Sequence, residues 1–94
     1  MFPLSRQVCQ IVFFTKPGCP LCDKAMALFD AITKDSRVRL RPVNILSDPV
    51  LFDTYGIRIP VFLFPDGTTV EAPVHREDLI RALKRCAGEP GNAP

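Results

Sequence analysis

Hydrophobic residues form short runs along the chain, separated by turn residues, and their spacing alternates between strand-like and helix-like. The first run, about Gln7 to Phe14, is continuously apolar, which is typical of a central strand buried on both faces. After the turn at residues 15–18, apolar residues recur at helical spacing until Asp35 and Ser36. This second segment therefore predicts a helix with Pro20 in its first turn and one face buried on the sheet.

The middle of the chain predicts an edge strand and a short helix. Between Val38 and Asn44 aliphatic and basic residues alternate, which is a strand pattern, and Pro42 confines that strand to an edge of the sheet. Asp48 followed by a proline is typical of a capped helix start, and Gly56 is a suitable end. We expect this helix to span about Asp48 to Tyr55.

The last third predicts a hairpin and a final helix. Apolar stretches at residues 59–64 and 68–72 flank a Pro-Asp-Gly turn, which favours two antiparallel strands. Apolar residues then share one helical face from about Arg76 to Cys86, before Gly88. The element order is βαβαββα, an α/β fold whose four-stranded mixed sheet is flanked by three helices in two or three layers.

The composition fits one domain. The chain has 94 residues and is 47% hydrophobic, enough for a single core, which we place at residues 7–87 with a mobile tail at 88–94. The net charge of +2 is spread along the chain without a basic stripe, which argues against a nucleic-acid partner. No secretory leader or apolar run of membrane-spanning length is evident, so we expect a monomeric, cytoplasmic protein without a membrane partner.

The candidate chemistry lies at the start of the first helix, where the sequence reads Cys19-Pro20-Leu21-Cys22. The thiolate is the reactive form of cysteine, and the N–H groups at a helix N-terminus stabilise negative charge. Cys19 is therefore the candidate nucleophile. Cys22 follows within the first turn, close enough to resolve a mixed disulfide formed on Cys19.

Other interpretations of the cysteines stay open at this point. A zinc site needs about four ligands, and the remaining donors, Cys9, Cys86 and His75, are isolated along the chain, so we predict no metal site. Cys9 and Cys86 are expected to be buried structural thiols, with a bond from Cys86 to a partner as the lesser alternative. The thiols are expected to be reduced at rest, and His75 to be a loop or capping residue.

At these residues the chain resembles the glutaredoxins and, more broadly, proteins of the thioredoxin fold. The stretch from Lys16 to Cys22 looks like the glutaredoxin signature of a lysine three residues before C-P-x-C, with Leu21 where tyrosine is usual. Ile59-Pro60 looks like the family's second hallmark. The likeness covers about Val8 to Cys86 and is greatest to short glutaredoxin-like bacterial proteins, which share Asp-Pro, Tyr-Gly and Ile-Pro pairs found here at residues 48–49, 55–56 and 59–60.

The resemblance implies a cis Ile59–Pro60 bond facing the thiols, with the backbone of Ile59 free to pair with a bound peptide or glutathione. Lys16 and Arg58 are candidates for meeting an anionic substrate, with a solvated surface charge as the alternative for each. The predicted substrate-binding residues are Lys16, Pro20, Leu21, Arg58, Ile59 and Pro60.

The chain also departs from the family pattern. Glutaredoxins that grip glutathione carry a Gly-Gly pair and an aspartate at the start of the last helix, whereas this chain has Val74-His75-Arg76-Glu77-Asp78. Asp78 fits the aspartate, but the glycines are missing, which puts glutathione specificity in doubt.

These features predict a thiol-disulfide oxidoreductase with no tightly bound cofactor. Its partners would be protein or small-molecule disulfides, with glutathione as a candidate co-substrate. The alternative is a redox-inert adaptor that uses the surface beside Pro60 to hold a peptide or an iron-sulfur cluster.

Overall fold

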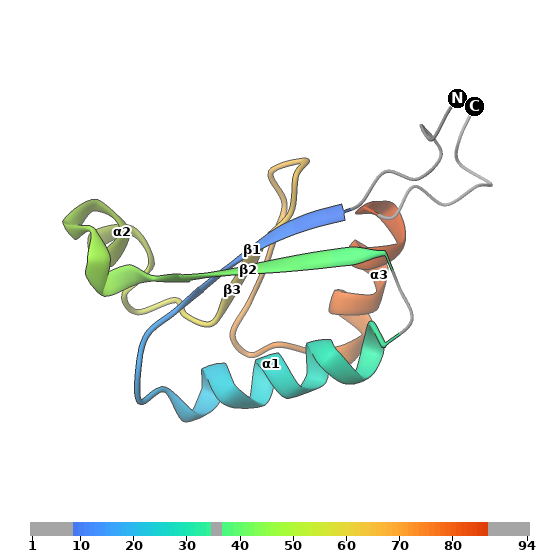
Figure 1. The fold of residues 1–94 in the computed structure, drawn as a ribbon, viewed down its shortest axis with the longest axis horizontal. Coiled ribbons are helices and arrows are strands. Elements are labelled where there is room, and N and C mark those ends of the chain that lie inside the picture. Colours follow the sequence, from blue (N-terminus) through green and yellow to red (C-terminus); the bar gives the residue numbers. More distant parts are fainter. Residues whose placement is uncertain (1–8, 35–36, 87–94) are drawn as a thin grey trace.

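The computed structural model describes residues 9–34 and 37–86 and shows the predicted α/β architecture (Figure 1). The elements follow one another as β1 (Cys9–Thr15), α1 (Pro20–Ile32), β2 (Val38–Asn44), the 3-10 turn η2 (Ile45–Ser47), α2 (Pro49–Tyr55), β3 (Val61–Leu63), β4 (Thr69–Glu71) and α3 (Arg76–Cys86). No helix in this part of the chain is long and apolar enough to cross a membrane.

The four strands form one mixed sheet in the order β2-β1-β3-β4. β1 runs parallel to β2, and β3 is antiparallel to both β1 and β4. Phe13 of β1 lies opposite Pro42 on one side and Phe62 on the other. β1 is thus a central strand and β2 an edge strand, as the sequence predicts.

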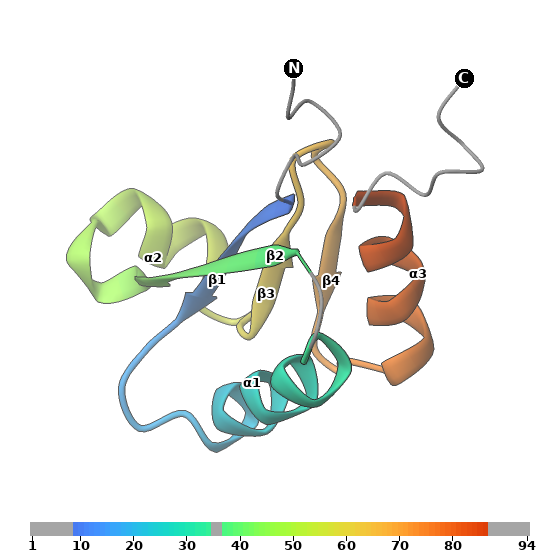
Figure 2. The same ribbon diagram turned by 45° about the vertical axis from the view of Figure 1, so that its right-hand side comes forward.

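The sheet carries a core on each face. On one face, alternate residues of β1, among them Ile11 and Phe13, pack with the apolar sides of α1 and α3. On the other face, Phe14 packs with Ile45 and Val61, and Tyr55 of α2 stacks on the Phe14 ring. The fold therefore has three layers, with α1 and α3 on one face and α2 on the other (Figure 2). Burial on both faces explains the continuous apolar run of β1.

The element boundaries differ from the sequence predictions mainly in the hairpin. β3 and β4 are shorter than the predicted strands, and β3 begins only at Val61, since Pro60 before it has no N–H to donate to a neighbouring strand. α2 begins one residue late, since Asp48 acts as its cap and accepts a hydrogen bond from Val50 N at 2.9 Å. The predicted helix end at residues 35–36, the stop at Gly88 and the mobile tail lie outside the described residues.

Gly56 ends α2 for a steric reason. Its N–H donates to the Phe52 carbonyl at 2.8 Å, and a Cβ at this position would lie 2.6 Å from the same oxygen. Only glycine allows this close approach without a shift of the backbone.

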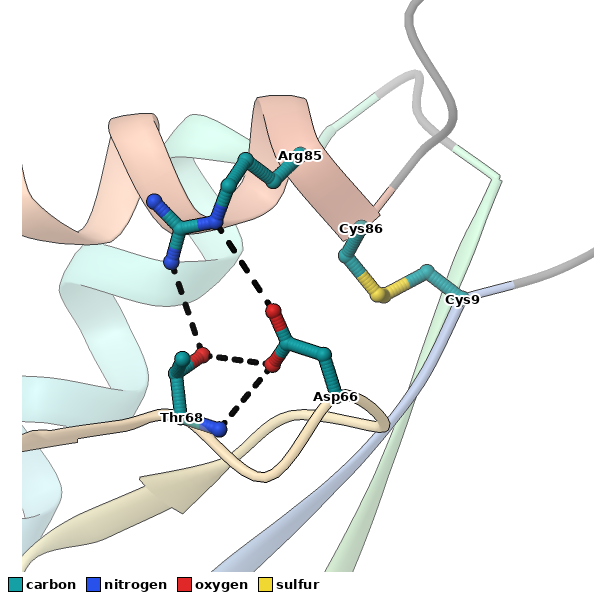
Figure 3. Close-up of a disulfide and its surroundings, with 5 residues drawn as sticks. All are labelled: Cys9, Asp66, Thr68, Arg85 and Cys86. Carbon is teal, nitrogen blue, oxygen red and sulfur yellow. Dashed lines mark hydrogen bonds and ion pairs between the residues drawn. A yellow bond between two sulfur atoms is a disulfide. The ribbon is translucent and has the colours of Figure 1, made fainter. Parts of the chain in front are cut away.

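A disulfide bond joins Cys9 at the start of β1 to Cys86 at the end of α3 (Figure 3). The expectation of two separate structural thiols is therefore wrong, because the fold brings the first strand and the last helix together with a Cα–Cα distance of 5.7 Å. Nε of the neighbouring Arg85 lies 3.8 Å from Oδ2 of Asp66, in the turn between β3 and β4. The C-terminal end of α3 is thus held to the sheet at two points.

Candidate active site

Cys19 occupies the N-cap position of α1. Gly18 before it has a φ of +73°, a conformation that glycine adopts at low cost, and this turns the chain from the end of β1 into the helix. The Sγ of Cys19 accepts a hydrogen bond from the backbone N–H of Cys22 at 3.1 Å. An N–H group aimed at sulfur at a helix N-terminus stabilises the thiolate over the neutral thiol.

Cys19 and Cys22 form a disulfide in the structure, with a Cα–Cα distance of 5.2 Å. The two side chains differ in accessibility, since Cys22 is only 2% exposed whereas Cys19 is half-buried. Pro20 and Leu21 between them are exposed, and Pro20 takes the first helical position, where a missing N–H costs nothing. A partner molecule could therefore reach Cys19 first, with Cys22 behind it.

The Ile59–Pro60 peptide bond is cis, as the resemblance implies, and Pro60 is buried. The N–H of Ile59 donates to the carbonyl oxygen of Tyr55 at 3.1 Å. The expectation of a free Ile59 backbone therefore does not hold for its N–H group, which is used inside the protein. The side chain of Ile59 packs between the two cores and is half-buried.

Arg58 is held within the fold. Its Nε donates to Glu71 Oε1 at 3.1 Å, its second guanidinium nitrogen pairs with the other carboxylate oxygen, and its charge lies 5.0 Å from the centre of the Tyr55 ring. The hydrogen bonds raise the pKa of Arg58 and hold the pKa of Glu71 below its ordinary value. This pairing joins the segment before Pro60 to β4. Because Glu71 offsets the charge of Arg58, Arg58 is less able to bind an anionic substrate.

The Arg58–Glu71 pair predicts a specific response to acid. Because the folded-state pKa of Glu71 lies below the ordinary 4.5, the carboxylate adds stability above pH 4.5 and loses that contribution as the pH falls through the folded-state value. We expect the Glu71→Gln variant to have a lower urea midpoint at pH 7, and the difference from the unsubstituted protein to shrink below pH 4. Equal midpoints at pH 7 would show that the pair adds nothing to stability.

Two further predicted site residues, Lys16 and Leu21, lie on the surface on either side of Cys19 in the sequence, and His75 lies near α3. Lys16 is exposed in the turn before Cys19, and Leu21 is 58% exposed. His75 lies just before α3, where its carbonyl oxygen accepts hydrogen bonds from the N–H groups of Asp78 and Leu79. Its backbone therefore supports the helix start, in keeping with a capping position.

A groove of about 520 Å³ is lined by Leu21, the residue that precedes Cys22, although neither Cys19 nor Cys22 lines it. One wall comes from α1, and the other consists of Pro60 and residues 72–74, which connect β4 to α3. Leu21 and Pro60 thus line the same groove, and the N–H of Ala72 donates to the Pro60 carbonyl at 3.2 Å. The α1 residues of this wall are Leu21, Lys24, Ala25 and Leu28.

Sequence reasoning missed the far wall of this groove. The Ala72–Pro73 bond is cis, like Ile59–Pro60, and the hydrogen bond from Ala72 to Pro60 places the two segments side by side. The sequence signal was the proline directly after the predicted fourth strand, but nothing in it shows which loop it would face. Within the described residues, no group of three or more His, Cys, Asp or Glu side chains is placed to hold a metal ion.

Comparisons with known proteins agree with this geometry. Among solved structures, the chain is similar to target protein XcR50 from X. campestris, with 27% identity, a TM-score of 0.68, and coverage of 80% of this chain and 96% of that one. Protein Ne2328 from Nitrosomonas europaea shares the fold at 24% identity, with a TM-score of 0.68 and coverage of 82% and 92%.

The fold also matches the first two thioredoxin domains of Saccharomyces cerevisiae Eps1p, with 24% identity, a TM-score of 0.52, and coverage of 95% of this chain and 38% of that one. No curated protein matches this chain. The family described as "Glutaredoxin-like domain (DUF836)" matches residues 10–84, which include Cys19, Cys22 and Pro60. The chain therefore belongs to this glutaredoxin-like family and has a thioredoxin-like fold.

Proposed function

We propose that this protein is a thiol-disulfide oxidoreductase that works through Cys19 and Cys22. The observation that carries the proposal is the position of Cys19, whose Sγ accepts the Cys22 N–H at the start of α1 and is within bonding reach of the Cys22 sulfur. A thiolate stabilised there is an effective nucleophile, and a second thiol beside it completes a two-electron couple.

The reaction starts from the reduced pair. The Cys19 thiolate attacks one sulfur of a substrate disulfide, and the other substrate sulfur leaves as a thiolate that takes up a proton. Cys22, as thiolate, then attacks Cys19 Sγ, which forms the Cys19–Cys22 disulfide and releases the second substrate thiol. The substrate gains two electrons. Two molecules of glutathione, which leave as glutathione disulfide, or a reductase then supply two electrons to the Cys19–Cys22 disulfide and restore the reduced pair.

The surface around the pair suits this role. Pro20 and Leu21 are exposed beside the sulfurs, and Pro60 lines the adjoining groove. Lys16 is exposed on the turn before Cys19, where its charge can meet an anionic group on a substrate. Ile59 is half-buried and Arg58 is paired with Glu71, and both contacts hold the segment before Pro60 in place.

A turnover assay tests the proposal. Catalytic amounts of the protein are mixed with a peptide that contains one intramolecular disulfide, with glutathione or dithiothreitol as electron donor, and peptide thiols are counted over time. We expect reduction above the rate of donor alone, in proportion to the protein added. No acceleration with either donor would overturn the proposal.

A further inference from the structure

We propose that the groove beside the Cys19–Cys22 disulfide selects protein substrates in which an apolar side chain lies next to the disulfide, rather than glutathione. This inference rests on the proposed function and names its substrate class. The groove begins at Leu21, between the two cysteines, so a chain whose disulfide reaches Cys19 would place its neighbouring residue there.

The groove is apolar along most of its length. Of the residues that line it, Ala25 and Pro60 are buried, Leu28 and Val74 are half-buried, and Leu21 is exposed. Its volume of about 520 Å³ is ample for a large aliphatic or aromatic side chain. Apolar surface removed from water on both sides of such a contact favours binding.

The charges in the groove do not match glutathione, which carries two carboxylates and one ammonium group. Among its described lining residues Lys24 is the one charged side chain, and it could meet one carboxylate at most. Asp78 does not line the groove, and its carboxylate accepts a hydrogen bond from Arg81 at 3.0 Å. The ammonium group of glutathione would therefore lack an acidic partner among the lining residues.

The backbone near the groove also argues against glutathione as the preferred substrate. The N–H of Ile59 is already bonded to Tyr55, so it is not available to a substrate main chain in this conformation. Val74, which lines the groove, carries a side chain, whereas a close approach of backbone to ligand there would need glycine. With fewer main-chain bonds on offer, selectivity depends more on the apolar side chain that enters the groove.

The test compares three substrates of the unsubstituted protein. Two peptides each contain one intramolecular disulfide and differ only in the residue next to the first cysteine, which is Leu in one and Asn in the other. The third substrate is glutathione disulfide, with dithiothreitol as donor throughout. We expect kcat/KM for the Leu peptide to exceed that for the Asn peptide by about tenfold or more. We also expect it to exceed that for glutathione disulfide.

A matched pair of variants locates the source of the preference. Leu21 and Leu46 are 58% and 57% exposed, but Leu46 lies on η2 and does not line the groove. We expect Leu21→Asn to lower the ratio of kcat/KM for the Leu peptide to kcat/KM for the Asn peptide by at least threefold. This is about half of a tenfold effect on a logarithmic scale. Leu46→Asn should leave it unchanged. Urea unfolding midpoints show that both variants are folded, and if either is not, the three-substrate comparison alone decides.

Each other outcome overturns the inference. Equal rates for the two peptides, or faster turnover of glutathione disulfide, would contradict the inference while the proposed function stands. A preference that survives Leu21→Asn, or that Leu46→Asn also removes, would show that the groove is not its source. Reduction of none of the three substrates would instead mean that the proposed function itself fails.

Discussion

Replacing Cys19 by serine is expected to reduce disulfide turnover to the rate of the electron donor alone. A serine hydroxyl at this position keeps the cap but does not supply a thiolate, and the remaining thiol of the pair, Cys22, is only 2% exposed and therefore poorly placed to attack a substrate disulfide. Cys22→Ser serves as the matched variant, since it keeps the nucleophile and removes only the resolving thiol.

The Cys22→Ser variant should retain the first step and stop at the second. We expect a mixed disulfide between Cys19 and the substrate that is stable enough to be seen by mass spectrometry, and no such adduct with Cys19→Ser. Dithiol turnover should fail in both variants, whereas glutathione-dependent release of the adduct can survive in Cys22→Ser. An adduct on Cys22 in the Cys19→Ser variant would reverse the two roles.

The second large effect concerns the disulfide at the other end of β1. The Cys9–Cys86 bond joins residues 77 positions apart, and in the chain-entropy account a cross-link of that length stabilises the folded state by about 4.5 kcal/mol. The Cys9→Ala/Cys86→Ala double variant should therefore unfold more than about 10 °C below the unsubstituted protein. Thermal unfolding followed by circular dichroism measures this difference directly.

A reductant provides the control for this prediction. Dithiothreitol opens both disulfides of the unsubstituted protein but only Cys19–Cys22 in the double variant. If reduction lowers the unfolding temperature more in the unsubstituted protein, the difference is the contribution of the Cys9–Cys86 bond. The small cavity left where Cys9 is replaced, a residue only 4% exposed, affects both redox states of the variant alike. Unfolding temperatures that differ by less than 2 °C, with and without reductant, would show that the cross-link does not stabilise the fold.

Much of the fold could be predicted because local patterns and long-range packing agree. The apolar run from Ile11 to Phe14 in β1 marks a strand covered on both faces, and the structure places a helical layer on each. The alternation of basic and aliphatic residues with Pro42 marks an edge, and β2 lies there. The prediction of a helix from about Arg76 to Cys86 agrees with α3, because the apolar residues on its buried face recur at helical spacing, which is a strong signal.

The parts that could not be predicted depend on contacts between segments far apart in sequence. Cys9 and Cys86 are isolated cysteines in the sequence, and only the closing of α3 onto β1 brings them together. The sequence makes Arg58 a candidate for binding an anionic substrate, because its partner Glu71 lies 13 residues away, at the end of β4. Likewise, the helix start identifies Cys19 and Cys22, but the groove beside them needs residues 72–74, whose position depends on the sheet.

The most direct test of the account is a redox titration of the purified protein against glutathione buffers. Thiols are trapped at each potential, and each disulfide is located by mass spectrometry after digestion, so that Cys19–Cys22 is followed separately from Cys9–Cys86. The account predicts that Cys19–Cys22 opens and closes reversibly at a potential between roughly −180 and −280 mV, the interval from protein disulfide isomerase to thioredoxin. A pair that forms neither a disulfide nor a glutathione adduct across that range would contradict it.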